Sequence, residues 1–319
     1  MAPTKNKTNV TEFILHGLTE DRTAAKVYFL LFLVFYVATI LGNLLITITI
    51  KISEQLNSPL YFFLSYLSFV DIGYSTITAP KLLHDLLVEK KTISLVGCIA
   101  QLFAGHFFGC TEILLLTAMA YDRCVAIWKP LHYTTIVNRQ VCGWLVVASW
   151  VGGFVHSVVQ TLLVVQLPFC GPNEIDHFYC DVHPLLKLAC TDTHVIGVGV
   201  AANSGVISLS CFVVLVVSYA VILVSLRAHS SEGRLKALYT CTSHITVVVL
   251  FLGPCIFIYL RPSTTFSADK MVSVFYTIIT PMLNPLIYTL RNEEVKNTIK
   301  KLWSRKVKRR NETTHACVS

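Results

Sequence analysis

Seven long stretches of the chain are almost free of charged residues, and they determine the expected fold. Five contain no Asp, Glu, Lys or Arg, and the other two contain one acid each, Asp71 and Glu112. A helix needs about 20 apolar residues to cross the hydrocarbon core of a membrane, and each stretch is long enough. We therefore predict seven transmembrane helices, within residues 27–50, 55–80, 92–121, 140–173, 193–226, 237–260 and 271–290.

Two of these stretches, 140–173 and 193–226, have 34 residues each, but neither needs to hold two spans. The first ends in turn-forming residues at Pro168, Gly171 and Pro172, and the remaining segment is too short to cross again. The short alternating segments of a membrane β-barrel are missing from the sequence. The expected fold is an all-α seven-transmembrane helix bundle, with no second domain and no internal repeat.

Composition agrees with a membrane protein. Of the 319 residues, 54% are hydrophobic and 14% are charged, whereas a soluble domain usually carries about a quarter charged residues. So few charges cannot cover the surface of a soluble protein of this length. The high apolar content also excludes an intrinsically disordered chain.

The basic residues predict the orientation of the bundle. With the N-terminus outside and the C-terminus inside, sixteen of the 26 Lys and Arg residues fall on the inner side, as the positive-inside rule requires. Residues 1–25 are then an extracellular segment, 26–290 the seven-helix domain, and 291–319 a cytoplasmic amphipathic helix and basic tail. Anionic lipid heads or a cytoplasmic protein suit this basic tail better than nucleic acid.

Sequons and cysteines indicate an outer side exposed to an oxidising compartment. Asn6 and Asn9 begin two Asn-X-Thr glycosylation sequons in the N-terminal segment. Four cysteines fall on the outer side, which suggests two disulfides. Their spacing leaves all three pairings open. The four are Cys98, Cys170, Cys180 and Cys190.

Five motifs, in register with the seven spans, carry a family resemblance. The third span ends in Met-Ala-Tyr-Asp-Arg-Cys-Val-Ala-Ile at 119–127, followed by Lys-Pro-Leu-His-Tyr at 129–133. The second opens with Pro-Leu-Tyr at 59–61, and the sixth contains Thr-Cys-Thr-Ser-His at 240–244. The seventh ends in Pro-Met-Leu-Asn-Pro-Leu-Ile-Tyr-Thr-Leu-Arg-Asn at 281–292. Together these motifs resemble the olfactory receptors, a branch of the rhodopsin-like G-protein-coupled receptors.

The resemblance implies a function and a disulfide pattern. The expected protein is an odorant receptor in the plasma membrane of olfactory sensory neurons. It would bind a small, mostly apolar volatile ligand and activate a stimulatory olfactory G protein, which raises cyclic AMP. The family pattern pairs Cys98 with Cys180 and Cys170 with Cys190.

Motif residues near the inner ends of the spans are the candidate G-protein switch. Asp122 and Arg123 can pair in a closed bundle and separate when it opens. A proline inside a helix removes a backbone hydrogen bond and bends the helix. The resemblance implies that Pro285 makes the seventh span a hinge. The set is Asp122, Arg123, Tyr219, His244, Asn284, Pro285 and Tyr288.

The two acids within the spans need a partner or a water-filled cavity. One interpretation is that both are protonated and hydrogen-bonded. The other, which the resemblance supports, is a hydrated sodium site that biases the bundle toward the inactive state. Its candidate residues are Asn43, Asp71, Glu112 and Asn284. No other cofactor is expected.

Helix phase gives a candidate ligand pocket about four to five turns outward of Arg123. The lining is expected to contain few ionisable groups, which favours a neutral ligand held by one hydrogen bond from His106 or Asn203. The candidate residues are His106, Phe107, Gly109, Cys110, Asn203, Ile207, Leu252, Cys255, Ile256, Tyr259, Phe275 and Thr277.

Three other functions have weaker support in the sequence. A transporter or ion channel would favour inverted repeats or matched broken helices, which the sequence does not contain. An intramembrane enzyme would need a catalytic pair at mid-depth, and only Asp71 and Glu112 qualify. A metal site at His177, Cys180, Asp181 and His183 would need the Cys180 thiolate, which a disulfide removes.

Overall fold

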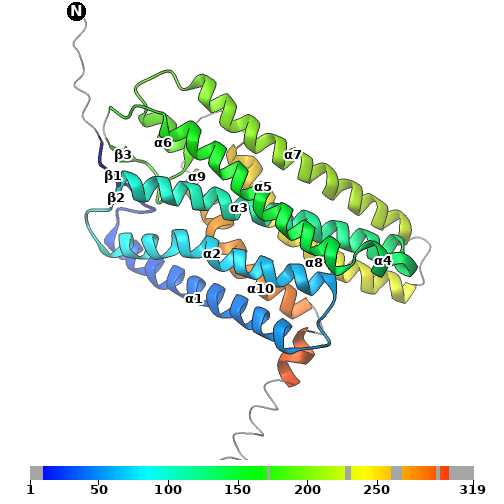
Figure 1. Cartoon of the computed structure of the whole chain (residues 1–319). Coiled ribbons are helices and arrows are strands. Elements are labelled where there is room, and N and C mark those ends of the chain that lie inside the picture. Colours follow the sequence, from blue (N-terminus) through cyan, green and yellow to red (C-terminus); the bar gives the residue numbers. More distant parts are fainter. Residues whose placement is uncertain (1–9, 171–172, 227–230, 260–267, 292–294, 302–319) are drawn as a thin grey trace, which may run out of the picture.

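The computed structural model describes residues 10–170, 173–226, 231–259, 268–291 and 295–301. Within these residues, seven membrane-length helical spans pack side by side as a bundle (Figure 1). The first six are single helices: α1 (Arg22–Ile52), α2 (Pro59–Leu87), α3 (Leu95–Trp128), α5 (Arg139–Val165), α7 (His194–Ser225) and α8 (Ser231–Tyr259).

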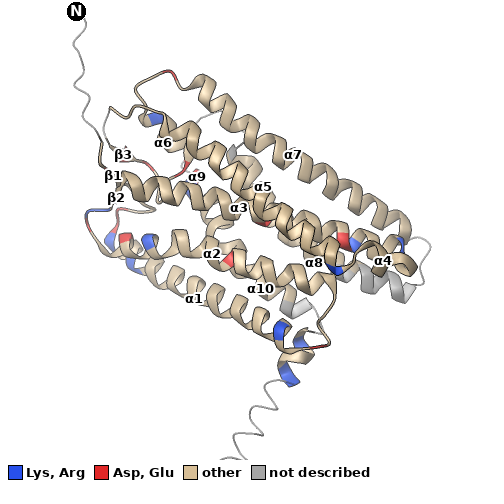
Figure 2. Cartoon of the chain, viewed as in Figure 1, with Lys and Arg blue, Asp and Glu red and all other residues tan. Residues whose placement is uncertain are grey.

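The bundle is the predicted seven-helix fold, with its spans in the predicted order. Large apolar side chains are exposed on the outside of the bundle, most of all on α1 and α7, as expected for helices that face lipid. Lys and Arg gather at the two ends, and the middle is almost free of charge (Figure 2). The chain is a multi-pass membrane protein.

Local sequence explains several helix starts. The Asp21 carboxylate accepts hydrogen bonds from the backbone N–H groups of Thr23 and Ala24, and so caps α1. Ser94 and Asn138 cap α3 and α5 in the same way. These caps satisfy N–H groups that a first helical turn leaves without partners.

The seventh span is distorted at a place that the sequence analysis did not predict. It consists of α9 (Ala268–Val274), a π-helical turn (Phe275–Ile279) and α10 (Thr280–Arg291). Pro285 lies inside α10, beyond the π turn. The Phe275 carbonyl oxygen accepts from the Thr280 backbone N–H and, at 3.0 Å, from the Thr280 hydroxyl.

Short elements at one end of the bundle were also missed. The strands β1 (Glu12–Leu15), β2 (Thr92–Ser94) and β3 (Glu174–Ile175) form a sheet in the order β2-β1-β3. β1 is antiparallel to β2 and parallel to β3. A short helix, α6 (Val182–Leu188), follows β3. We call this end the sheet end. All-α therefore describes the spans but not these connecting segments.

The opposite end, which we call the Arg123 end, carries two short elements after α3. They are a 3-10 turn (Pro130–His132) and α4 (Tyr133–Ile136). Residues 295–301 form a further helical segment beyond α10.

Helices α3 and α5 pack tightly at Gly153. A Cβ atom at this position would lie 2.9 Å from the Phe107 carbonyl oxygen and would overlap the Thr111 hydroxyl. Small residues let membrane helices pack at such short distances. Glycine at 153 therefore permits the short distance between α3 and α5, and α3 lines a cavity near the sheet end.

Candidate functional site

A cavity near the sheet end contains about 660 Å³ of empty space, part of it open to solvent. It is lined by α2, α3, α5, α7, α8, the π turn and the loop segment 179–181. Its walls carry both apolar and polar side chains. The lining residues are Tyr74, Thr78, Gln101, Leu102, Gly105, His106, Gly109, Cys110, Ile113, His156, Tyr179, Cys180, Asp181, Ser204, Ile207, Ser208, Phe251, Cys255 and Tyr276.

Five of the residues that the sequence nominated for ligand binding lie on this wall. They come from three helices that are far apart in the sequence, α3, α7 and α8. The five are His106, Gly109, Cys110, Ile207 and Cys255.

Two nominated residues, Phe107 and Asn203, are instead used in contacts with α5. The Phe107 ring lies 5.4 Å from the Trp150 ring, because it points about 100° around α3 from His106. The Asn203 side-chain amide donates to His156 Nδ1 at 3.0 Å. The predicted hydrogen bond from Asn203 to a ligand is therefore not supported by its position.

Four of the five remaining nominated residues also lie off the wall. The Phe275 side chain is 43% exposed on the outside of the bundle. The Thr277 hydroxyl donates to the Ser273 carbonyl oxygen within its own helix. Leu252 and Ile256 pack in the apolar core, and the Tyr259 side chain lies outside the described residues.

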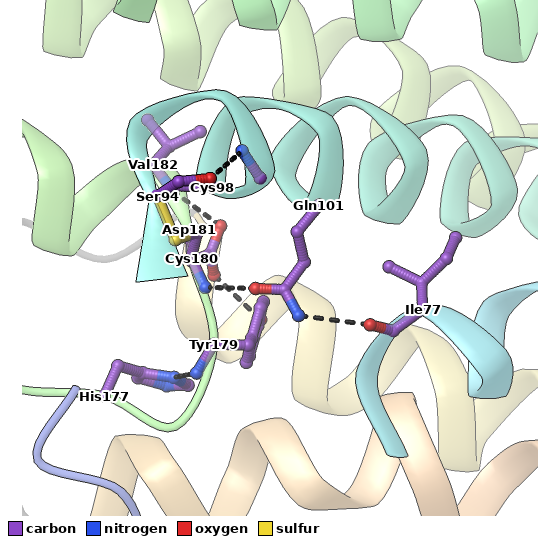
Figure 3. Close-up of a disulfide and its surroundings, with 10 residues drawn as sticks. Ile77, Ser94, Cys98, Gln101, His177, Tyr179, Cys180, Asp181 and Val182 are labelled. Carbon is purple, nitrogen blue, oxygen red and sulfur yellow. Dashed lines mark hydrogen bonds between the residues drawn. A yellow bond between two sulfur atoms is a disulfide. The ribbon is translucent and has the colours of Figure 1, made fainter. Parts of the chain in front are cut away.

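None of the residues nominated for ligand binding came from the outer loop, which reaches into the cavity. Figure 3 shows the segment that carries Tyr179, Cys180 and Asp181 beside the start of α3. Gln101 of α3 fixes it, because its side-chain oxygen accepts from the Cys180 N–H at 2.9 Å and its NH₂ group donates to the Ile77 carbonyl oxygen at 3.1 Å. The sequence signal for this position was the expected disulfide between Cys98 and Cys180, because it places the neighbours of Cys180 over α3.

Asp181 gives the cavity more ionisable character than the sequence suggested. It is buried and lines the cavity, and its Oδ1 lies 3.7 Å from His106 Nε2. Burial alone raises the pKa of Asp181, but the imidazoles of His106, His183 and His177 outweigh burial and hold that pKa below its usual value. The carboxyl is therefore ionised at neutral pH.

His177, in the same loop, is in the opposite state. It is buried, and its ring stacks on Phe178 with centroids 4.7 Å apart. Burial lowers the pKa of His177 to about 4, although Asp181 favours the charged form. The imidazole is therefore neutral at pH 7.

A second polar cluster lies in the middle of the bundle. The Asn284 amide donates to Asp71 Oδ1 at 3.0 Å and to Glu112 Oε1 at 3.3 Å. All three side chains are buried, and Glu112 Oε2 and Asn284 Oδ1 have no hydrogen-bond partner among the described residues. No described hydrogen bond joins Asn43 to these three residues. Its NH₂ group donates to the carbonyl oxygens of Thr39 and Pro281, and its buried Oδ1 has no partner among the described residues.

The Arg123 end holds the predicted ion pair of the switch. Arg123 Nε donates to Asp122 Oδ2 at 2.8 Å. The Tyr133 hydroxyl of α4 donates to Asp122 Oδ1 at 2.6 Å. Tyr133 belongs to the motif at 129–133 but was not among the predicted switch residues. Asp122 is fully buried. The Arg123 guanidinium balances its charge, and the Tyr133 hydroxyl satisfies its other oxygen.

The other switch residues lie on α7, α8 and α10. The hydroxyl of Tyr219 is hydrogen-bonded to His244 Nδ1, which joins α7 to α8. Tyr288 is buried, and no partner for its hydroxyl is found among the described residues. Pro285 lies against α1, where its Cγ would be 3.0 Å from a Cβ at Gly42.

The disulfides join Cys98 to Cys180 and Cys170 to Cys190. Cys180 therefore offers no thiolate for a metal. In the part of the chain that the structure describes, no group of three His, Cys, Asp or Glu residues is arranged to hold a metal ion. The sequons at Asn6 and Asn9 lie outside the described residues.

Comparisons with known proteins agree on one family. The family model described as "Olfactory receptor" matches residues 32–306. Human olfactory receptor 4S2 is 66% identical over 299 residues, covering 94% of this chain and 96% of that protein. Human olfactory receptor 4B1 is 61% identical, covering 93% and 96%.

A solved structure supports the fold. Squid rhodopsin matches with a TM-score of 0.73, covering 90% of this chain and 87% of its own. Its sequence identity is 12%, so this likeness concerns the fold alone.

Proposed function

Because the chain belongs to the olfactory receptor family of rhodopsin-like G-protein-coupled receptors, we propose that it binds a small volatile odorant in the cavity at the sheet end. Binding raises cyclic AMP through a stimulatory olfactory G protein. The protein is an odorant receptor and not an enzyme. Its place of action is the plasma membrane of olfactory sensory neurons, with the sheet end outside.

The observation that carries this proposal is the cavity itself. Its deeper part is apolar, with Ile113 of α3 and Phe251 of α8, and its sheet end carries the polar side chains of Tyr179 and Asp181. Such a lining suits a mostly apolar molecule with one polar group, since buried polar groups fix a ligand's orientation. His106 and the loop residues are the hydrogen-bonding groups for that polar end.

The Arg123 end supports coupling to a G protein. Arg123 is held by Asp122 in this closed arrangement, and opening the bundle releases it for a protein partner. Leu131, in the connection after α3, is 92% exposed. A large apolar side chain so exposed on the water-facing side suits a protein interface.

A sodium ion at the central acid cluster is the proposed modulator. Asp71, Glu112 and Asn284 converge there, and no basic partner of either acid is found among the described residues. Two buried oxygens, Glu112 Oε2 and Asn284 Oδ1, lack hydrogen-bond partners in the described part and can bind a hard cation. Asn43 remains a candidate ligand, since its buried Oδ1 also lacks a partner among the described residues. A cation bound better by the closed bundle lowers basal activity.

The test is a cyclic-AMP assay in cells challenged with a panel of volatiles. A responding odorant should lose its effect in Gly105→Phe, because Gly105 lines the cavity and faces open space that the ring would fill. The matched control is Gly143→Phe on α5. A Cβ added at Gly143 also has no atom within 4 Å, but Gly143 does not line the cavity. Equal responses in both variants, at matched surface expression, would show that the odorant binds outside this cavity.

A further inference from the structure

A chain of hydrogen bonds crosses the sheet end of the cavity, from the loop to the seventh span. The Tyr179 hydroxyl donates to Asp181 Oδ2 at 3.0 Å. Because that proton is used, the Tyr276 hydroxyl donates to the Tyr179 oxygen at 2.6 Å, and the Tyr276 oxygen lies 3.2 Å from Ser273 Oγ, within hydrogen-bonding distance. All four side chains are buried. We call the Asp181–Tyr179–Tyr276 contacts the tyrosine latch.

The loop half of the latch is held rigidly. Cys180, between Tyr179 and Asp181, is tied to α3 through its disulfide with Cys98. Its N–H group is also bound by Gln101 (Figure 3). Asp181 accepts from both Tyr179 and the Val182 N–H, which holds the loop half together. The ties of Cys180 to Cys98 and Gln101 make this half move with the outer end of α3.

The other half lies on the π-helical turn of the seventh span. Tyr276 is the second residue of the π turn Phe275–Ile279. A π turn widens the helix and disturbs the regular ladder of backbone hydrogen bonds, and such turns are frequent at functional sites. The segment above it, α9, has one further tie to the loop, an ion pair between Lys270 and Asp176 at 2.6 Å.

The latch is within reach of a ligand. Tyr179, Asp181 and Tyr276 all line the cavity, so a polar group bound there meets the same hydroxyls that join the loop to the seventh span. A ligand hydroxyl or carbonyl can replace one tyrosine as the partner of the other. The apolar remainder of such a ligand then lies against Cys110 and Phe251, deeper in the cavity.

We propose that the tyrosine latch holds the outer part of the seventh span against the loop in the ligand-free receptor, and that a neutral odorant opens it by placing a hydroxyl or carbonyl group between Tyr179 and Tyr276. The inference rests on the proposed function. It assigns Tyr276 and Tyr179 as positioning residues, which act on the bundle through the π turn and α10. Asn284 and Tyr288 lie on that same helix, α10.

The latch predicts coupled effects of its two tyrosines. Tyr179→Phe and Tyr276→Phe each remove the shared hydrogen bond, so each should raise basal cyclic-AMP output about three- to tenfold, the range expected for one buried neutral hydrogen bond. The double variant should show little more than the larger single effect, because both substitutions break the same contact.

The matched control is Tyr36→Phe. The Tyr36 hydroxyl is hydrogen-bonded to Thr76 Oγ1 at 3.3 Å, which joins α1 to α2 away from the latch. This variant also loses an interhelical hydroxyl pair, but it should leave basal output unchanged at matched surface expression. A loss of signal that follows reduced surface expression would show a merely structural role and contradict the latch.

Hydrogen exchange of purified receptor in micelles separates the latch from the proposed function. Amides of residues 268–279 should exchange faster in both latch variants than in the parent or in Tyr36→Phe. Unchanged exchange overturns the latch, whatever the signalling result. Faster exchange with no cyclic-AMP signal above mock-transfected cells from any variant supports the latch contact and contradicts the proposed coupling. Faster exchange with basal output equal to a signalling parent overturns the role of the latch in activation.

Discussion

Replacing Gly153 with alanine should destabilise the receptor far more than the same change elsewhere on α5. The added Cβ overlaps the Thr111 hydroxyl and lies 2.9 Å from the Phe107 carbonyl oxygen. Thr111 can rotate away only by giving up its own hydrogen bond to that carbonyl, which is 2.7 Å long. The carbonyl belongs to the backbone of α3, so it moves only if the helices separate.

The expected magnitude follows from two opposing effects. Overpacking a tight contact costs about 1–3 kcal/mol, and a backbone obstacle places Gly153→Ala near the upper end, at about 3 kcal/mol. Glycine to alanine within a helix gains up to about 1 kcal/mol from backbone entropy. The net loss is therefore about 2 kcal/mol.

Two glycines on the same helix serve as controls. Gly143 has no atom within 4 Å of its added Cβ, so Gly143→Ala should gain stability by up to about 1 kcal/mol. Gly152→Ala meets only the flexible Leu114 side chain at 2.8 Å and should fall between the two.

The assay is thermal unfolding of purified receptor in detergent micelles. The melting temperatures should rank Gly143→Ala above the parent and Gly153→Ala well below it. Adding Thr111→Ala to Gly153→Ala should recover part of the lost stability, because it removes the overlap with the Thr111 hydroxyl. The recovery should be incomplete, because the contact with the Phe107 carbonyl remains. A Gly153→Ala variant as stable as Gly143→Ala would show that α3 and α5 do not approach as closely as described.

Three further predictions concern charge. Burial lowers the pKa of His177 from 6.5 to about 4, so the folded protein binds a proton at His177 less readily than the unfolded chain does. Relative to His177→Gln, the parent should therefore lose up to about 3 kcal/mol of stability as pH falls from 6.5 to 4. Melting temperatures that fall equally with pH in both proteins would refute this. Raising sodium should lower basal cyclic AMP in the parent but not in Asp71→Asn or Glu112→Gln, and an equal response to sodium in all three would refute the cation site. Tyr133→Phe removes a donor to Asp122 and should raise basal signalling about threefold or more; unchanged output at matched surface levels would refute the role of Tyr133.

The spans and the Asp122–Arg123 contact were predictable because their signals are local. Charge-free runs mark helices that must lie in hydrocarbon, and the Asp122–Arg123 pair needs only neighbouring residues to form. The π turn at Phe275–Ile279 has no such signal, since the sequence shows a proline at 285 and the widening occurs before it.

The cavity was only partly predictable, because helix phase fixes direction but not neighbours. Phe107 and His106 lie at similar depth, yet only His106 faces the cavity. Tyr179 and Asp181 reach the cavity through a loop whose path depends on the disulfide to Cys98. The strands β1 and β3 pair across more than 150 residues, beyond the reach of any local pattern.

The most direct test of the central claim is nucleotide exchange on purified stimulatory G protein, driven by the receptor in lipid nanodiscs with an odorant identified in cells. The account predicts that the odorant accelerates exchange with the parent, and that Arg123→Ala binds the odorant equally well but leaves exchange at its unstimulated rate. Full acceleration by Arg123→Ala would reduce Asp122–Arg123 to a topology signal. Odorant-driven ion flux in liposomes, with no exchange on the G protein, would contradict the receptor assignment and indicate a channel or transporter.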